Sequence, residues 1–145
     1  MASLLNSEDQ ERVVHAINLA ENMTSGEIRI VIENTVDGDD VMKKATNYFD
    51  ELEMYNTVSR NGVLIYLAIA DHQFAIIGDN GINERVEPDF WECTKDEMLT
   101  FFRRGDYAGG LVAGIQQAGK RLQHYFPRQE DDINELPNDI YFGKH

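Results

Sequence analysis

Cysteine is nearly absent from this sequence, which contains a single one, Cys93. An internal disulfide is therefore excluded. No histidine stands beside Cys93 with catalytic spacing, so we interpret it as a half-buried structural thiol. Long apolar runs are also absent, because the longest, Val63 to Ala70, has eight residues and a membrane helix needs about 20. The sequence predicts no membrane span.

Basic residues are scarce, with 13 Lys and Arg against 26 Asp and Glu and a formal net charge of −13. Such a chain repels phosphate backbones and anionic membrane surfaces, and it attracts cations. We therefore expect no nucleic-acid binding, and a basic protein is the kind of partner that this charge favours. The amino terminus shows no basic region followed by an apolar block, so the expected location is the cytoplasm.

Several familiar site patterns are missing as well. The four histidines show no close pairing, which argues against a zinc site. No Ser-His-Asp or Cys-His arrangement supports a nucleophilic hydrolase. The segment Asp37-Gly38-Asp39 is not an EF-hand, because the twelfth position of such a loop would be Tyr48 instead of glutamate.

Hydrophobic periodicity is present and predicts alternating helices and strands. Ser7 with Gln10 forms a capping box that opens a helix over residues 7–23. The acidic segment 37–40 caps a second helix. The strands are expected at residues 28–32, 63–69 and 74–77, and the connection before the last of these is short enough to require an antiparallel hairpin.

The last third of the domain is predicted to be helical. A short helical piece is expected over residues 82–86, a helix follows Pro88 as far as Phe102, and Asp106 can cap the final long helix. That final helix contains four glycines, each of which costs about 1 kcal/mol relative to alanine. We infer that it packs closely against a neighbouring helix.

These elements predict an α/β fold, a three-layer α/β/α sandwich whose small mixed sheet combines a βαβ unit with an antiparallel hairpin strand. We assign residues 1–126 to this domain and residues 127–145 to an acidic tail. The tail is either loosely attached or adds an edge strand.

The predicted topology places acidic residues at two opposite ends of the sheet. The amino rim, where the parallel strands begin, gathers Glu27, Asp79, Asn80, Glu84 and Asp106. The carboxyl rim, where they end, gathers Glu33, Asp37, Asp39, Asp40 and Asp71.

Carboxylates, amides and backbone carbonyls are the ligands of calcium and magnesium. Gly78 and Gly81 would let the backbone turn carbonyls inward at the amino rim, where Asp79 is expected to lie in a turn and bury little surface. Open α/β sheets more often bind ligands at the carboxyl ends of their strands. Helix caps and solvated strand starts explain the same residues, so the pattern leaves both rims open.

Four segments, in order, resemble the TPM domain family, which is named for thylakoid-lumen and photosystem II members. Thr24-Ser25-Gly26-Glu27-Ile28 looks like the opening motif, and residues 60–65, Arg-Asn-Gly-Val-Leu-Ile, look like the second-strand motif. Residues 77–82, Ile-Gly-Asp-Asn-Gly-Ile, are similar to the family's glycine-rich loop, and residues 101–111 match the start of its last helix. The resemblance covers residues 10–125.

The resemblance implies an α/β/α sandwich that binds calcium or other divalent ions, with Glu27, Asp79, Glu84 and Asp106 as ligands. The function expected is that of a divalent-cation-binding TPM-type domain, a calcium-responsive binding or adaptor protein. The alternative is a metal-dependent acid phosphatase acting on phosphate monoesters, because a plant member is described as one. A phosphate-gripping Arg or Lys beside the carboxylates would favour the enzyme. Arg85, Arg103 and Arg104 are the arginines nearest in sequence.

Overall fold

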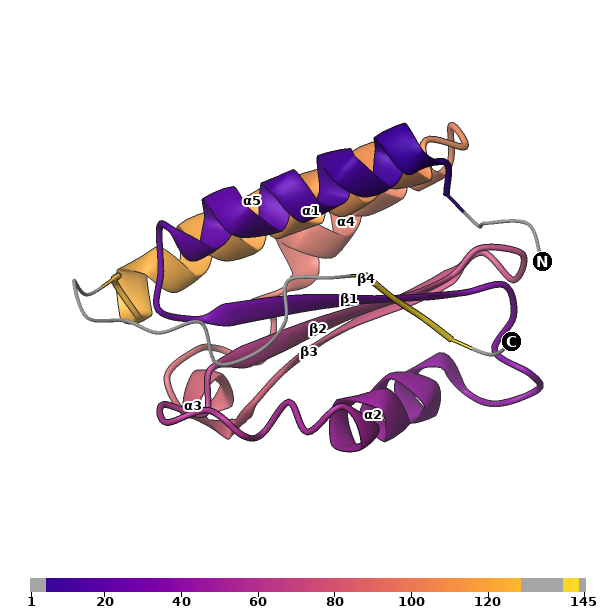
Figure 1. Ribbon diagram of the computed structural model, residues 1–145. Helices are drawn as coiled ribbons and strands as arrows, with labels where there is room; N and C mark the ends of the chain where they lie inside the picture. Colours follow the sequence, from indigo (N-terminus) through magenta and orange to yellow (C-terminus); the bar gives the residue numbers. More distant parts are fainter. Residues whose placement is uncertain (1–4, 129–139, 144–145) are drawn as a thin grey trace.

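A four-stranded mixed sheet forms the middle layer of the molecule (Figure 1). The computed structural model describes residues 5–128 and 140–143. The strand order is β3-β2-β1-β4, and the strands are β1 (Glu27–Glu33), β2 (Gly62–Ala68), β3 (Gln73–Gly78) and β4 (Ile140–Phe142). The α/β fold predicted from the sequence is confirmed.

Strand register follows from the alternation of buried side chains. β1 and β2 are parallel with Glu27 opposite Gly62, and β2 and β3 are antiparallel with Val63 opposite Gly78. Both central strands are buried on both faces, which explains their nearly continuous apolar sequences. The βαβ unit and the antiparallel hairpin are as predicted.

Helices cover both faces of the sheet. α1 (Ser7–Glu21), α4 (Glu92–Phe102) and α5 (Tyr107–Tyr125) lie on one face, and α2 (Val41–Glu51) lies on the other. The single turn α3 (Asn80–Asn83) follows β3. Two hydrophobic cores result, one on each side of the sheet, as expected for a three-layer sandwich.

The glycines of α5 allow close helix packing, as the sequence predicts. A Cβ at Gly110 would lie 2.3 Å from Phe102 Cε1, and one at Gly114 would lie 2.5 Å from Met98 Sδ. At Gly119 the neighbour would be Ala20 of α1, at 3.0 Å. α5 is thus held between α4 and α1.

Two details of the helix starts differ from the prediction. The N-cap of α1 is Asn6, whose side chain accepts a hydrogen bond from Asp9 N, so the expected Ser7 cap is wrong by one residue. The Gln10 amide instead donates to Leu5 O. Asp40 occupies the N-cap position of α2 but makes no side-chain capping bond.

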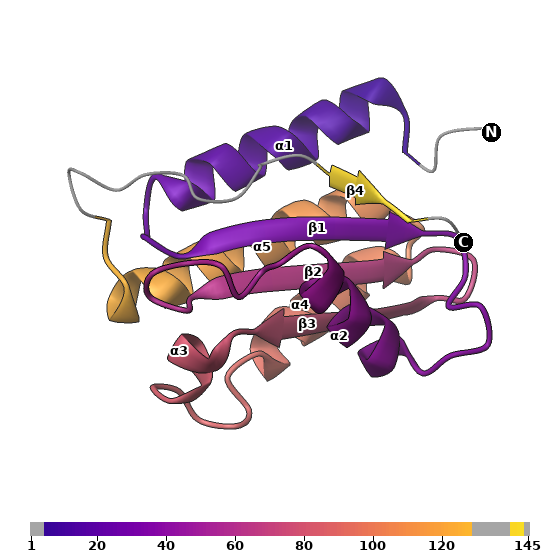
Figure 2. The ribbon, with the colours of Figure 1, turned by 60° about the horizontal axis from the view of Figure 1, so that its bottom comes forward.

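The carboxyl-terminal segment returns to the sheet. Ile140–Phe142 forms β4, which pairs in parallel with residues 30–32 of β1 (Figure 2). Gly143 N then donates to Ile32 O. Residues 129–139, which make up much of the predicted tail, lie outside the described residues. In the described part of the chain, no helix is both long and apolar enough to cross a membrane.

Candidate functional site at the amino rim

Two buried carboxylates lie at the amino rim, at corresponding positions of two strands. Glu27 is opposite Gly62, and Asp79 N donates to Gly62 O, so these three residues form one row across the sheet. Glu27 and Asp79 are each 4% exposed. Because their neighbours Ile28 and Gly78 face the α1–α5 layer, both side chains belong to the α2 side of the sheet.

Asp79 forms a bidentate ion pair with Arg60. Arg60 Nε donates to Oδ2 at 2.7 Å, and Nη2 donates to Oδ1 at 3.0 Å. Oδ1 also accepts from Asn80 N at 2.7 Å, which caps α3. The expectation that Asp79 would bury little surface is wrong. Its ion pair with Arg60 and its capping of α3 hold the side chain in a buried position at the end of the sheet.

Arg60 is fixed in place through its backbone. Its φ is 50°, in the left-handed region that non-glycine residues rarely occupy. Its carbonyl accepts from Gly81 N at 2.8 Å. A Cβ at Gly81 would lie 2.2 Å from Ser59 O and 2.6 Å from Arg60 O, so only glycine allows this approach. The loop before β2 is therefore tied to the loop after β3.

The side chain of Arg60 supplies positive charge among the carboxylates. Its hydrogen bond to Asp79 raises the pKa of the guanidinium above its usual value, and the charge of Glu84 acts in the same direction. The side chain is 46% exposed, whereas that of Asp79 is 4% exposed. Arg60 can thus move into water more easily than Asp79 can.

Glu84 lies close enough to Arg60 for its charge to act on the guanidinium, and its side chain is exposed. It is the C-cap residue of α3. The preceding residue, Asn83, donates from its side chain to Gly78 O at 3.1 Å. The carbonyl of Gly78, which was expected to turn inward as a ligand, therefore accepts a hydrogen bond within the protein.

One backbone oxygen, that of Met54, lies close to Gly62 in the same row. A Cβ at Gly62 would lie 2.9 Å from Met54 O, so the missing side chain leaves room for that carbonyl. Gly62 stands between Glu27 and Asp79 in the row. The α2 side of the amino rim therefore carries two carboxylates and a carbonyl, which are oxygen ligands of the kind that hard cations bind.

Asp106 lies at the other end of the molecule. It caps α5 by accepting from Gly109 N at 2.9 Å. The next residue, Tyr107, contacts His72 in the β2–β3 turn through its hydroxyl, 3.4 Å from Nδ1. The amino rim instead meets the far end of α5, where Thr24 donates to Phe126 O. A helix of 19 residues spans about 28 Å, so the structure brings Glu27, Asp79 and Glu84 to one end and leaves Asp106 at the opposite one.

The carboxyl rim holds a buried ion pair. Glu33 is 0% exposed, accepts from the Tyr66 hydroxyl at 2.8 Å and lies 3.3 Å from Lys44 Nζ of α2. Burial and the hydrogen bond to Glu33 raise the pKa of Tyr66 above its usual value. Gly143 covers Glu33 closely, since a Cβ there would lie 2.2 Å from Glu33 Cγ.

The other carboxyl-rim acids hold the local backbone. Asp71 accepts from Val36 N at 2.7 Å, which ties the β1–α2 loop to the β2–β3 turn. Asp39, which precedes α2, is 3.8 Å from Lys43 in an exposed ion pair, and Asp37 adopts a φ of 55°. Within residues 5–128 and 140–143, no three Asp, Glu, His or Cys side chains form a group that could hold a metal ion.

The arginine beside the carboxylates, Arg60, entered the sequence analysis only as the first residue of the second-strand motif. Arg85 stacks on Phe126 at 4.5 Å and Arg104 on Phe101 at 5.0 Å, so these two are engaged elsewhere. The arginine that contacts a carboxylate of the amino rim is Arg60, through its ion pair with Asp79. The available signal was its position two residues before Gly62, which places it at the start of β2 next to the end of the antiparallel β3.

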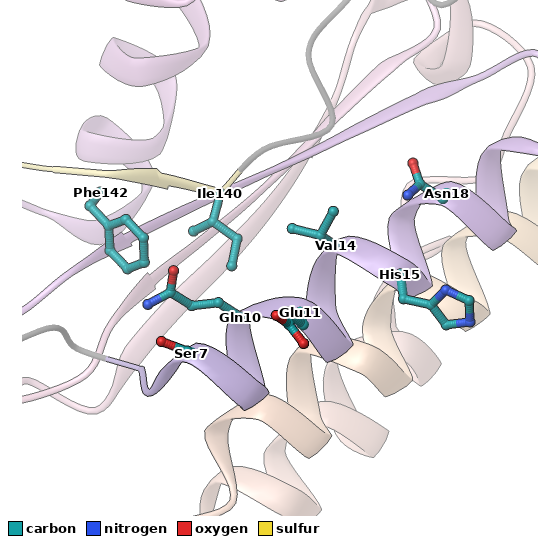
Figure 3. A pocket seen from close by; sticks show the side chains of 8 residues that line it. All are labelled: Ser7, Gln10, Glu11, Val14, His15, Asn18, Ile140 and Phe142. Atoms are coloured by element: carbon teal, nitrogen blue, oxygen red, sulfur yellow. The ribbon is translucent and has the colours of Figure 1, made fainter.

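A separate groove of about 640 Å³ runs between α1 and β4 (Figure 3). Ile140 and Phe142 of β4 lie beside Gln10 and Val14 of α1 in this groove. None of the predicted metal ligands lines it.

Comparison with known proteins relates most of the chain to one family. The TPM domain matches residues 1–121. The NMR structure of BA42 protein from the psychrophilic bacterium Bizionia argentinensis is 45% identical, with a TM-score of 0.93, and the match covers 99% of this chain and 98% of that one. No curated protein sequence matches the chain.

More distant structures share the fold alone. The N-terminal domain of cg2496 protein from Corynebacterium glutamicum is 15% identical, with a TM-score of 0.66, over 98% of this chain and 83% of that one. The N-terminal domain of a P. gingivalis protein is 19% identical, with a TM-score of 0.71, over 88% of this chain and 83% of that one.

Proposed function

We propose that this chain, which belongs to the TPM domain family, binds calcium or magnesium at its amino rim and acts as a cation-responsive binding module. The observation that carries the proposal is the arrangement around Arg60, where Asp79 and Glu84 both act on one guanidinium. An arginine thus provides the positive charge that these carboxylates require. A divalent ion would exchange with it.

Three carboxylates would hold the cation once its binding draws them together, because in the described residues they do not already form a group that could hold a metal ion. Glu27 and Asp79 lie in one row, and Glu84 would be drawn in as an exposed ligand from the end of α3. Met54 O offers a neutral oxygen close to Gly62 in the same row. When bound, a divalent ion brings twice the charge of a guanidinium, and Arg60, 46% exposed, can leave for solvent.

Exchange at Arg60 would give the module its response. Residues 52–61 connect α2 to β2, and Arg60 is the point where that segment is tied to Asp79 and Gly81. Release of the guanidinium would loosen this segment and place its charge on the surface. A basic protein is the partner that the net charge of −13 favours.

The experiment is a calcium titration followed by backbone amide NMR. We expect the amides of Glu27, residues 54–62 and residues 79–84 to shift in one saturable process, while those around Asp106 stay unchanged. Cation at a hundred times its dissociation constant adds about 2.7 kcal/mol, which raises the melting temperature of a domain of this size by roughly 5–10 °C. Shifts confined to residues 34–40 and 69–72 would move the site to the carboxyl rim.

A metal-dependent phosphatase is the second candidate, and Arg60 is the observation that favours it. An arginine among cation-binding carboxylates is suited to grip a phosphoryl group, and the matching family model is named for a phosphatase. A bound divalent ion would neutralise phosphoryl oxygens. Hydrolysis of p-nitrophenyl phosphate should then be lost with chelator and in Arg60→Gln. Activity that survives both treatments contradicts this candidate.

A further inference from the structure

A second cavity, of about 440 Å³, opens on the helical layer between the start of α4 and the last turns of α5. Its volume lies within the range of small-molecule sites, about 300–1,000 Å³. It shares no residue with the ligands proposed at the amino rim. Its lining side chains are Glu87, Asp89, Phe90, Cys93, Arg121, His124 and Tyr125.

Aromatic rings form one wall of this cavity. Phe90 is 9% exposed and meets Trp91 edge to face, with 4.6 Å between the ring centroids. It also meets Tyr125 at 5.9 Å, and Tyr125 meets His124 at 4.9 Å. Interlocked rings of this kind form a rigid apolar surface against which a ligand can lie.

Arg121 brings an uncompensated positive charge to the cavity. Its guanidinium carbon lies 5.4 Å from the centroid of the Phe90 ring. Its Nε is buried without a hydrogen-bond partner, and Arg121 forms no ion pair with any residue in the described part of the chain. A guanidinium has five N–H donors, and the packing that orients this one leaves the Nε donor without a partner.

Negative charge lines the same cavity without reaching Arg121. Glu87 and Asp89 are both exposed lining residues. Neither has an atom within 4.0 Å of a basic group in the described residues. One cavity is therefore lined by a cation and two carboxylates that form no ion pair with one another.

We propose that this cavity binds a small zwitterion with an apolar or aromatic body, namely a free amino acid or a dipeptide. Its carboxylate would pair with Arg121, its ammonium group with Glu87 or Asp89, and its body would lie on Phe90. A simple anion is repelled by the two carboxylates and by the net charge of −13, and a simple cation would leave Arg121 without an opposite charge. A ligand with both charges meets an opposite charge at each end.

The single cysteine provides a readout within the cavity itself. Cys93, which was predicted to be half-buried, is exposed and lines the cavity, so its alkylation rate reports occupancy. The probes are phenylalanine, alanyl-phenylalanine, N-acetylphenylalanine, which lacks the ammonium group, and phenylalaninamide, which lacks the carboxylate. We expect one of the two zwitterions to slow alkylation at millimolar concentration, and each blocked compound to bind about tenfold more weakly. Protection by the stronger zwitterion will identify an amino acid or a dipeptide as the ligand.

Charge variants separate this site from nonspecific protection. Arg121→Gln should weaken the protecting zwitterion about tenfold, and Asp89→Asn with Glu87→Gln should weaken it without burying any new group. Lys120→Gln, at the adjacent exposed position outside the cavity, is the matched control and should change nothing. The proposal is overturned if no zwitterion protects Cys93, if a blocked compound protects as well, or if binding is unchanged in the charge variants.

Discussion

Arg60 and Asp79 come from opposite sides of the β2–β3 hairpin and meet in a bidentate ion pair of 2.7 and 3.0 Å. The pair joins a half-exposed cation to a carboxylate that is 4% exposed. The buried partner is fixed and the exposed one can move. This asymmetry makes Arg60 the element that a competing cation would displace.

Asp106 serves as a helix cap and should not take part in cation binding. Asp106→Ala removes the hydrogen bond to Gly109 N, which should lower stability by about 1 kcal/mol. The increase in melting temperature on adding calcium should remain. If the variant instead loses its response to calcium, Asp106 is a ligand, as the family resemblance implies. Glu27, Asp79 and Glu84 would then not be the complete ligand set.

Tyr66 should make stability depend on pH in the alkaline range. Its pKa is raised above the ordinary 10.0 by burial and by Glu33, so above that pH the unfolded chain loses the proton while the folded chain keeps it. The contribution of Tyr66 is therefore complete below pH 10.0 and declines as the pH rises further.

Tyr66→Phe tests this linkage. At neutral pH it removes the hydrogen bond to Glu33 and should cost about 2 kcal/mol. Its free energy of unfolding should then fall less steeply with alkaline pH than that of the natural protein. Urea unfolding across this range measures both slopes, with the exposed Tyr55→Phe as control. Parallel slopes for Tyr66→Phe and the natural protein would contradict the assignment.

Gly110→Ala should destabilise the domain even though alanine favours helix. The new Cβ would lie 2.3 Å from the Phe102 ring and 3.1 Å from Met98 O. Overpacking of this kind costs about 1–3 kcal/mol, against about 1 kcal/mol of helix propensity gained. Adding Phe102→Leu should recover part of the loss in chemical denaturation. A stabilised single variant would show that α4 can move away from α5.

The fold was predictable because its signals are local and consistent. The continuous apolar stretch at Val63 to Ala70 gave the central strand, and the short connection after it required a hairpin. The Ser7 cap failed because Asn6 offers an equally good acceptor one residue earlier. Sequence spacing does not distinguish between them.

The site was predictable only in part, since it depends on distances between segments far apart in sequence. Placing Glu27 beside Asp79 required only the strand register. Asp106 was misplaced because the direction of α5 follows from its antiparallel packing on α4, which no local pattern records. Arg60 was overlooked because an arginine in a turn looks solvated until the residue across the hairpin is known.

The most direct test of the account is the calcium affinity of Arg60→Gln, measured by calorimetry beside the natural protein and Asp79→Asn. Because the guanidinium competes with the cation, its removal should tighten binding by roughly threefold to tenfold. Asp79→Asn keeps the shape of the side chain and should weaken binding. If Arg60→Gln binds calcium no more tightly, or Asp79→Asn binds it equally well, cation exchange at Arg60 is not how this domain works.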